Sequence, residues 1–284
     1  TFNSGSLVLN SGGTISNSGL IQTQGTVSFN IRGGSNFNAP VKVNTGTTTA
    51  TELSSPYIGR LFGNVTVDAG ANLYTGTSGS YSLEVYGNVI NNGIISGTGA
   101  AFILRGPSLT NNNSITSSNL RFNSTANLSG AGTFTSTNIY IDTFAVVNLL
   151  SNISVAPFTS MQVNNGAVLN PNAFFFTITN GRFDLNPGAT VTNSGTFRTQ
   201  GTVYLNIRNG SFFNAPVKVN TGTTTANEQS SPYIGRLFGN VTVDAGANLY
   251  TGTSGSYSLE VYGNVINNGI ISGTGAAFIL RGPS

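Results

Sequence analysis

The chain has no cysteine and no histidine among its 284 residues. Without cysteine it can form neither disulfides nor thiolate metal sites, and it has no cysteine nucleophile. Without histidine it lacks the commonest general base and metal ligand, and a Ser-His-Asp triad is excluded within the chain. These two absences leave few catalytic or metal-binding chemistries open to this sequence.

Charge is also scarce. Charged residues make up only 7% of the chain, against roughly 25% in ordinary soluble domains. Eleven basic and eight acidic side chains give a net charge of +3, and they are scattered singly. Because there is no basic patch, we expect no nucleic-acid partner. Little like-charge repulsion opposes self-association of such a surface.

Long apolar runs are missing as well. No segment approaches the roughly 18–20 apolar residues of a membrane-spanning helix, and no signal-peptide pattern opens the chain. We therefore expect no membrane span in this segment. Helix-forming Glu and Lys are rare, whereas Gly, Thr, Asn and Val recur throughout. This composition favours strands and turns over helices.

The sequence does contain a long internal duplication. Gly25–Ser108 recurs as Gly201–Ser284, 176 positions later, with six changes in 84 residues. The match extends back at lower identity to Thr1, which pairs with Thr177, giving 19 differences over 108 positions. Self-similarity on this scale is typical of solenoids or strings of domains.

The duplication divides the chain into two repeat units. Residues 1–176 form the first unit, of which 1–108 are duplicated and 109–176 occur once. Residues 177–284 form a second, incomplete unit. We therefore expect the chain to be a segment of a longer tandem array.

Two short motifs repeat within each unit. The first is apolar-x-x-Gly-small-x-apolar, and the second is apolar-x-Asn-polar-Gly/Asn-x-apolar. The first occurs at Leu9–Ile15, Val67–Leu73, Val163–Leu169, Leu185–Val191 and Val243–Leu249. The second occurs at Ile15–Ile21, Val89–Ile95, Leu109–Ile115, Val191–Phe197 and Val265–Ile271. Where the motifs follow one another, apolar residues recur at every sixth position.

A six-residue spacing fits neither a helix, which needs apolar residues three and four apart, nor one long strand, which needs alternate residues. It favours a short strand, a tight corner and another short strand, because Gly and Asn adopt left-handed backbone angles at low cost. Three such segments make a coil of roughly 18–22 residues in a stacked repeat. We predict an all-β fold, a parallel β-helix or solenoid with one continuous core.

An antiparallel alternative remains open. Asn-Gly is the strongest short signal for a β-hairpin, and it occurs at Asn92-Gly93, Asn165-Gly166, Asn180-Gly181 and Asn268-Gly269. Tandem antiparallel β-sandwich domains would use such turns. We favour the solenoid because the six-residue spacing recurs and several strands look too short to pair as isolated hairpins.

Two stretches depart from the spacing. Residues 44–57, with their copy 220–233, are polar and Thr-rich, and we expect loops that project from the coils. Loops on a rigid scaffold often carry binding residues, although these could equally cover the core. Phe174, Phe175 and Phe176 are consecutive, so they cannot all point inward on a strand, and we expect at least one to face outward.

Segments that carry these motifs resemble the repeats of a known class of proteins. Stretches such as Gly63–Leu73 and Gly87–Gly97 resemble the repeats of large bacterial surface proteins, namely filamentous-haemagglutinin-like adhesins, autotransporter passengers and other β-strand-repeat proteins. The resemblance implies a right-handed β-helix outside the cell, at the cell surface, in a stalk, filament or adhesin. It transfers no binding residues, because those proteins share no site motif.

An enzymatic role finds little support in the acidic residues. Glycoside hydrolysis normally needs two facing carboxylates, and here the acids are scattered at Glu52, Asp68, Glu84, Asp142, Asp184, Glu228, Asp244 and Glu260. Asp68 and Glu84 would revive a polysaccharide-acting enzyme only if they lay together in an open groove. We predict no enzyme, no catalytic or metal-binding residues and no cofactor.

The function that we expect is structural: a segment of a long extracellular fibre or stalk, in which repeats stack head to tail on copies of themselves. The alternative is an adhesin module that binds a surface glycan or protein through the loops at 44–57 and 220–233. A glycan array or replacement of those loops would separate the two.

Overall fold

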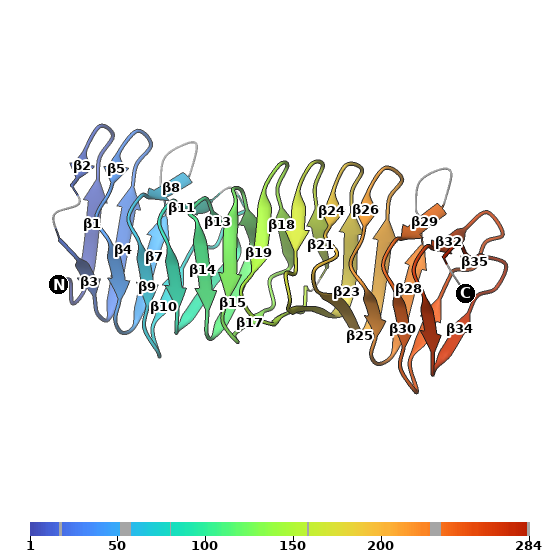
Figure 1. The fold of residues 1–284 in the computed structure, drawn as a ribbon. Helices are drawn as coiled ribbons and strands as arrows, with labels where there is room; N and C mark the ends of the chain where they lie inside the picture. Colours follow the sequence, from blue (N-terminus) through green and yellow to red (C-terminus); the bar gives the residue numbers. More distant parts are fainter. Residues whose placement is uncertain (17–18, 52–57, 80, 158, 228–233, 283–284) are drawn as a thin grey trace. The chain divides into compact units, whose positions relative to one another are not determined.

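The computed structural model describes residues 1–16, 19–51, 58–79, 81–157, 159–227 and 234–282. The described secondary structure consists of β-strands, without a helix (Figure 1). Parallel strands stack into a β-solenoid of about 12 coils, roughly 22 residues apart. The coils fall into two compact units, Thr1–Thr137 and Asn138–Ser284. The end of the first sequence repeat, at Phe176, therefore lies inside the second unit.

The first unit contains β1 (Gly5–Leu9), β2 (Thr14–Ile15), β3 (Ile21–Thr23), β4 (Thr26–Ile31), β5 (Asn36–Phe37), β6 (Val41–Val43), β7 (Thr47–Thr51), β8 (Ile58–Leu61), β9 (Val65–Val67), β10 (Asn72–Tyr74), β11 (Ser82–Val85), β12 (Val89–Asn91), β13 (Ile94–Leu104), β14 (Ser108–Asn111), β15 (Ser114–Phe122), β16 (Ala126–Ser129) and β17 (Thr133–Phe134).

The second unit contains β18 (Asn138–Ile141), β19 (Val146–Leu149), β20 (Ile153–Val155), β21 (Ser160–Val163), β22 (Val168–Asn170), β23 (Phe175–Leu185), β24 (Thr190–Val191), β25 (Thr196–Ile207), β26 (Phe212–Phe213), β27 (Val217–Val219), β28 (Thr223–Asn227), β29 (Ile234–Leu237), β30 (Val241–Val243), β31 (Asn248–Tyr250), β32 (Ser258–Val261), β33 (Val265–Asn267), β34 (Ile270–Ser272) and β35 (Ala277–Leu280).

A coil consists of three short strands, each paired in parallel with the strand one coil away. In the first unit, for example, β9, β10 and β11 form one coil, and β9 pairs with β6 below and β12 above. Paired residues are separated by as few as 18 positions (Ile103 and Arg121) and as many as 25 (Thr47 and Asn72). The prediction of a parallel solenoid is confirmed, with some coils longer than expected, and the antiparallel sandwich alternative is wrong.

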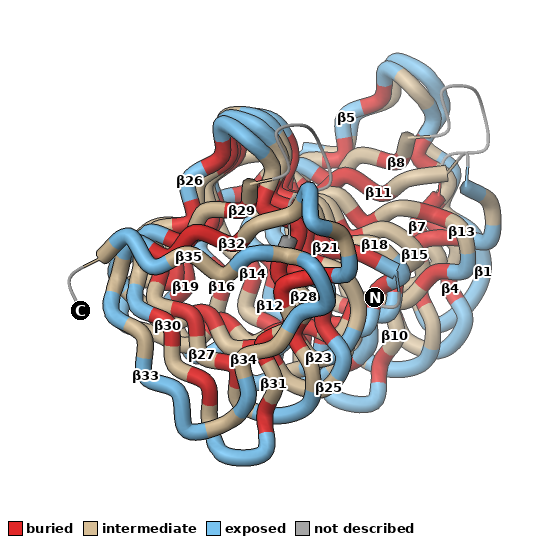
Figure 2. Tube along the Cα trace, turned by 90° about the vertical axis from the view of Figure 1, so that its right-hand side faces the viewer, coloured by how far each residue is buried: buried red, intermediate tan, exposed pale blue. Residues whose placement is uncertain are grey.

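The core lies inside the coils because alternate strand residues point inward. Val65 and Val67 of β9 are fully buried, whereas Thr66 between them is half-buried. Figure 2 shows this alternation of buried and less buried residues along the coils of each unit. The largest buried side chains are phenylalanines, namely Phe29, Phe37, Phe102, Phe134, Phe176, Phe183, Phe197 and Phe213.

The two glycine motifs make different corners. In the first motif, the five glycines have φ between 69° and 79°, in the left-handed region that favours glycine; they are Gly12, Gly70, Gly166, Gly188 and Gly246. In the second motif, Gly93 lies directly over the preceding coil. A Cβ atom there would lie 2.3 Å from the carbonyl oxygens of Asp68 and Ala71. Asn92-Gly93 and Asn165-Gly166 thus form coil corners and not hairpins, and Asn180-Gly181 lies at an irregularity within β23.

The prediction for the Thr-rich stretches needs correction. Thr47–Thr51 does not leave the coils: it is strand β7, paired with β4 and β10. Its copy β28 pairs with β25 and β31. Alternating small residues explain the difference, because Thr48 and Ala50 point inward and are fully buried. The rest of the two expected loops, 52–57 and 228–233, lies outside the described residues.

The two sequence copies differ where the second one ends. In the first copy, the coil formed by β12 and β13 is covered by β14 and β15 of the next coil. In the second copy, the same sixteen residues form β33, β34 and β35, and the described residues include no strand that pairs beyond them. Leu104 is consequently 0% exposed, whereas its copy Leu280 is 58% exposed.

Candidate functional site

One buried carboxylate cluster occurs once in each sequence copy. Glu84 lies on β11 and is 2% exposed. Its Oε2 atom accepts hydrogen bonds from Arg60 Nε at 3.1 Å and from the Tyr86 hydroxyl at 2.9 Å, and its Oε1 atom lies 2.7 Å from Arg105 Nη2. Arg60 comes from the coil before and Arg105 from the coil after. The carboxylate therefore joins three consecutive coils.

The electrostatics of Glu84 follow from these contacts. Burial raises the pKa of its carboxyl group, but the hydrogen bonds from Arg105, Tyr86 and Arg60 and the charge of Arg105 lower it by more. The net pKa lies below the usual value, so the group is ionised at neutral pH. A carboxylate held ionised by two guanidinium groups is a poor proton donor, and this arrangement suits a structural ion pair.

The copy in the second unit has the same geometry. Glu260 Oε2 accepts from Arg236 Nε at 3.1 Å and from the Tyr262 hydroxyl at 3.0 Å, and Oε1 lies 2.8 Å from Arg281 Nη2. Here too burial raises the pKa of Glu260, and the hydrogen bonds, with that from Arg281 the strongest, bring it below the usual value. The cluster is thus a repeated feature of the fold.

Asp68 has a different partner from Glu84. Its Oδ2 atom lies 3.0 Å from Lys42 Nζ of the preceding coil, and the copies Asp244 and Lys218 lie 3.1 Å apart. Asp68 follows strand β9, whereas Glu84 lies on β11, and each carboxylate forms ion pairs with different cations. The condition that would revive a polysaccharide-acting enzyme is therefore not met by Asp68 and Glu84.

The remaining acids show no shared site. Asp184 is 1% exposed, lies 2.8 Å from Arg182 Nε and accepts a hydrogen bond from Asn206 Nδ2 at 2.7 Å. Asp142 is 5% exposed. Glu52 and Glu228 lie outside the described residues. That the chain is not an enzyme stays a prediction.

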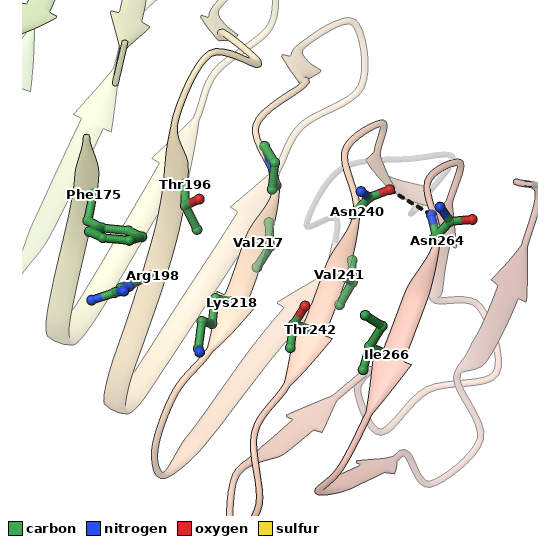
Figure 3. A pocket seen from close by; sticks show the side chains of 11 residues that line it. Phe175, Thr196, Arg198, Val217, Lys218, Asn240, Val241, Thr242, Asn264 and Ile266 are labelled. Carbon is green, nitrogen blue, oxygen red and sulfur yellow. Dashed lines mark hydrogen bonds between the residues drawn. The ribbon is translucent and has the colours of Figure 1, made fainter. Parts of the chain in front are cut away.

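A groove lies on the outer surface of the second unit, across strands β23, β25, β27, β30 and β33. Its volume is about 370 Å³, within the range of roughly 300–1,000 Å³ that small-molecule sites usually have. It is lined by Phe175, Thr196, Arg198, Pro216, Val217, Lys218, Asn240, Val241, Thr242, Asn264 and Ile266. Figure 3 shows these side chains side by side on neighbouring strands.

The register of the strands explains the order of the lining residues. Arg198 pairs with Lys218, Lys218 with Thr242 and Thr242 with Ile266, so these four outward side chains follow one another across the sheet. Val217 and Val241 are buried beneath them. On the other side, the Asn264 backbone N–H donates to Asn240 Oδ1 at 2.9 Å. The groove thus combines apolar surface with amide and hydroxyl groups.

Arg198 and Phe175 occupy one end of the groove. The Arg198 guanidinium carbon lies 3.3 Å from the centre of the Phe175 ring, a cation–π contact. Phe176 beside it is buried in the core, and Phe174 and Phe175 are half-buried. The expectation that the three phenylalanines would not all point inward is confirmed.

The sequence reasoning missed this groove. The signal available was the comparison of the two copies: Arg198 stands where the first copy has Gln22, and Thr196 where it has Leu20. Lys218, Asn240, Thr242, Asn264 and Ile266 have identical counterparts in the first copy. What distinguishes the second copy is therefore the end of the groove where Arg198 lies.

Comparison with family models, with curated proteins and with solved structures finds no match for this chain. In the part of the chain that the structure describes, no helix has the length and apolar character needed to cross a membrane.

Proposed function

We propose that this chain is a structural segment of a long extracellular tandem-repeat fibre or stalk, built by stacking β-coils. The observation that carries the proposal is the pair of identical coils. Strands β6, β9 and β12 of the first copy pair in the same register, residue for residue, as strands β27, β30 and β33 of the second. The repeated sequence therefore builds the same stack of coils twice, and a further repeat can stack in the same register.

Three further features support a mechanical role. The Glu84 and Glu260 clusters each join three coils, which ties neighbours together along the stack. Near-identical units make near-identical interfaces, and head-to-tail continuation of such interfaces produces a filament. Within each unit, strands such as β9 and β30 also pair on both sides, so their edges are not open to other chains. On this proposal the partners are copies of the repeat itself, and no catalytic role is assigned.

An extension experiment tests coil stacking. Residues 109–176 are appended after Ser284, in the order in which they follow Ser108, and hydrogen exchange of β33, β34 and β35 is measured. We expect slower exchange of these amides, because a parallel ladder engages backbone N–H groups of both paired strands, and in the first copy β12 and β13 pair in this way with β14 and β15. A chain extended by the same residues in shuffled order is the control. Equal exchange in both extended chains would contradict the proposal.

The location needs its own test. The resemblance to bacterial surface repeats and the low charge support an extracellular, cell-surface site. Antibodies raised against this chain and detected by immunogold on intact source cells should label the outside of the cell. Labelling confined to the cell interior would overturn this part of the proposal.

The adhesin alternative, with a glycan or surface protein bound by the segments at 44–57 and 220–233, rests on weaker ground. Thr47–Thr51 and Thr223–Asn227 are strands of the coil stack. Only the shorter segments 52–57 and 228–233 remain for it. Replacing both by short Gly-Ser linkers should abolish attachment to surfaces if they are the binding site, and should leave it unchanged if the role is structural.

A further inference from the structure

We propose that the groove of the second unit binds a saccharide that carries a carboxylate, with the carboxylate at Arg198 and neutral sugar rings along the neighbouring strands. This site goes beyond the structural role proposed above and does not depend on it.

Charge places the acidic group at one end of the groove. Two cations line it, Lys218 and Arg198. Lys218 already pairs with Asp244 at 3.1 Å. Among the described residues, no carboxylate forms an ion pair with Arg198. A carboxylate on a ligand matches the planar fork of a guanidinium and would supply this counter-charge.

The other lining groups suit neutral sugar rings. Asn240 and Asn264 are exposed and offer amide groups, and Thr196 and Thr242 offer hydroxyls, all able to exchange hydrogen bonds with sugar hydroxyls. Ile266, 57% exposed, adds apolar surface for the C–H faces of a ring. Strands lie about 4.7–4.9 Å apart, so each strand can present one polar group to successive rings of an extended saccharide.

The geometry disfavours the other anionic partners. A peptide that adds to a sheet needs a free strand edge, but the groove lies on a sheet face where backbone groups are already paired between strands β25, β27, β30 and β33. A nucleic acid needs several cations along its backbone, and here one cation lacks a counter-charge. A saccharide with a single acidic sugar at the Arg198 end needs neither a free strand edge nor several cations without a counter-charge.

The test uses the 284-residue chain and two probes, sialyllactose and an aldobiouronic acid (one uronic acid linked to one neutral sugar), each compared with its methyl ester. Binding is measured by saturation-transfer NMR and calorimetric titration. We expect at least one acid to bind at least about tenfold more tightly than its ester, which lacks the charge that pairs with Arg198. Absence of binding by both acids, or equal affinity of acid and ester, would overturn the proposal.

Arg198→Gln provides the decisive variant, because Gln22 occupies the corresponding position in the first copy and the fold accepts it there. We expect this variant to lose at least about tenfold in affinity for the acid and nothing for the ester. Arg32→Gln is the control, since Arg32 is exposed in the first unit and its loss changes net charge equally. Unchanged affinity in Arg198→Gln, or equal loss in both variants, would contradict the site, as would equally tight binding of a glutamate-rich peptide.

Discussion

The same sixteen residues occur twice in this protein in different surroundings. Val89–Leu104 forms β12 and the long strand β13, which β14 and β15 cover. Val265–Leu280 forms three short strands, beyond which the structure describes no further strand, and Ile95 and Phe102 are buried where Ile271 and Phe278 are half-buried. Since the sequence is constant, the difference measures what one neighbouring coil contributes. In a stacked repeat, stability resides largely in such interfaces.

The largest expected contrast concerns a core phenylalanine. Phe102→Ala removes a ring that is 0% exposed, and it should destabilise the surrounding coils by about 3–5 kcal/mol. Phe278→Ala, in the half-covered copy, should cost less than half of that. Hydrogen exchange with mass spectrometry gives the local free energy of opening for each copy. Equal losses would contradict the role assigned to the covering coil.

A buried amide gives the next contrast. Asn91 Nδ2 donates to Asn111 Oδ1 at 2.8 Å and to the Ser114 carbonyl at 2.9 Å, in full burial. Asn91→Ala leaves both acceptors without this donor and should cost about 1–3 kcal/mol. Asn267→Ala, at an exposed position, should stay within about 0.5 kcal/mol. Hydrogen exchange of the two variants measures both losses of stability. A large loss in Asn267→Ala would show that burial does not cause the difference.

The carboxylate clusters should behave alike in both copies, which sharpens the comparison. Glu84→Gln and Glu260→Gln each leave two arginines without a counter-charge. Because the side chains of those arginines are between 32% and 51% exposed, we expect a moderate cost of about 1–2 kcal/mol for each variant. Urea unfolding of the two single variants and the double variant measures it. A cost at Glu84 alone would mean that the cluster depends on the covering coil.

Acid should act through the same clusters. The pKa of Glu84 and of Glu260 is lowered from a value of 4.5, so each group adds stability that is fully present above pH 4.5. That stability is lost as the pH falls from 4.5 through the lowered pKa. The melting temperature should therefore drop in this window, and less so in the Glu84→Gln/Glu260→Gln double variant. Parallel curves for the two proteins would exclude the clusters as the cause.

The smallest stability effect should come from Arg198→Gln. The variant loses the stacking of Arg198 on Phe175, a contact worth about 0.5–1 kcal/mol. It also removes a buried donor without a partner, which offsets part of the loss. Thermal melting should therefore change little, and any large loss of saccharide binding in this variant would reflect the groove. A melting temperature lowered as much as in Phe102→Ala would assign Arg198 to the fold instead.

Much of the fold could be predicted because the corners of each coil are determined by residues that are close together in the sequence. The first motif forecasts the left-handed corners that Gly70 and Gly246 make. The error at Thr47–Thr51 arose because threonine is polar by composition, yet Thr48 is fully buried and its hydroxyl lies 2.6 Å from that of Thr23. The polarity of a residue in the sequence does not show whether its hydroxyl group forms a hydrogen bond with a residue of the neighbouring coil.

The groove could not be predicted for a related reason. Its lining residues come from five strands between Phe175 and Ile266, and their order across the sheet depends on coil lengths that vary between 18 and 25 residues. Phe175 and Arg198 lie 23 positions apart and meet only because β23 and β25 are adjacent. The sequence shows that Arg198 stands where the first copy has Gln22. Its position beside Phe175 can be inferred only from the register of the strands.

Electron cryomicroscopy of a protein with the 176-residue unit repeated three times tests coil stacking most directly. Coils about 4.8 Å apart along a continuous fibre, with each unit adding roughly 40 Å, are the result that the account predicts. Discrete beads separated by linkers, or a length that does not grow with each added unit, would contradict it.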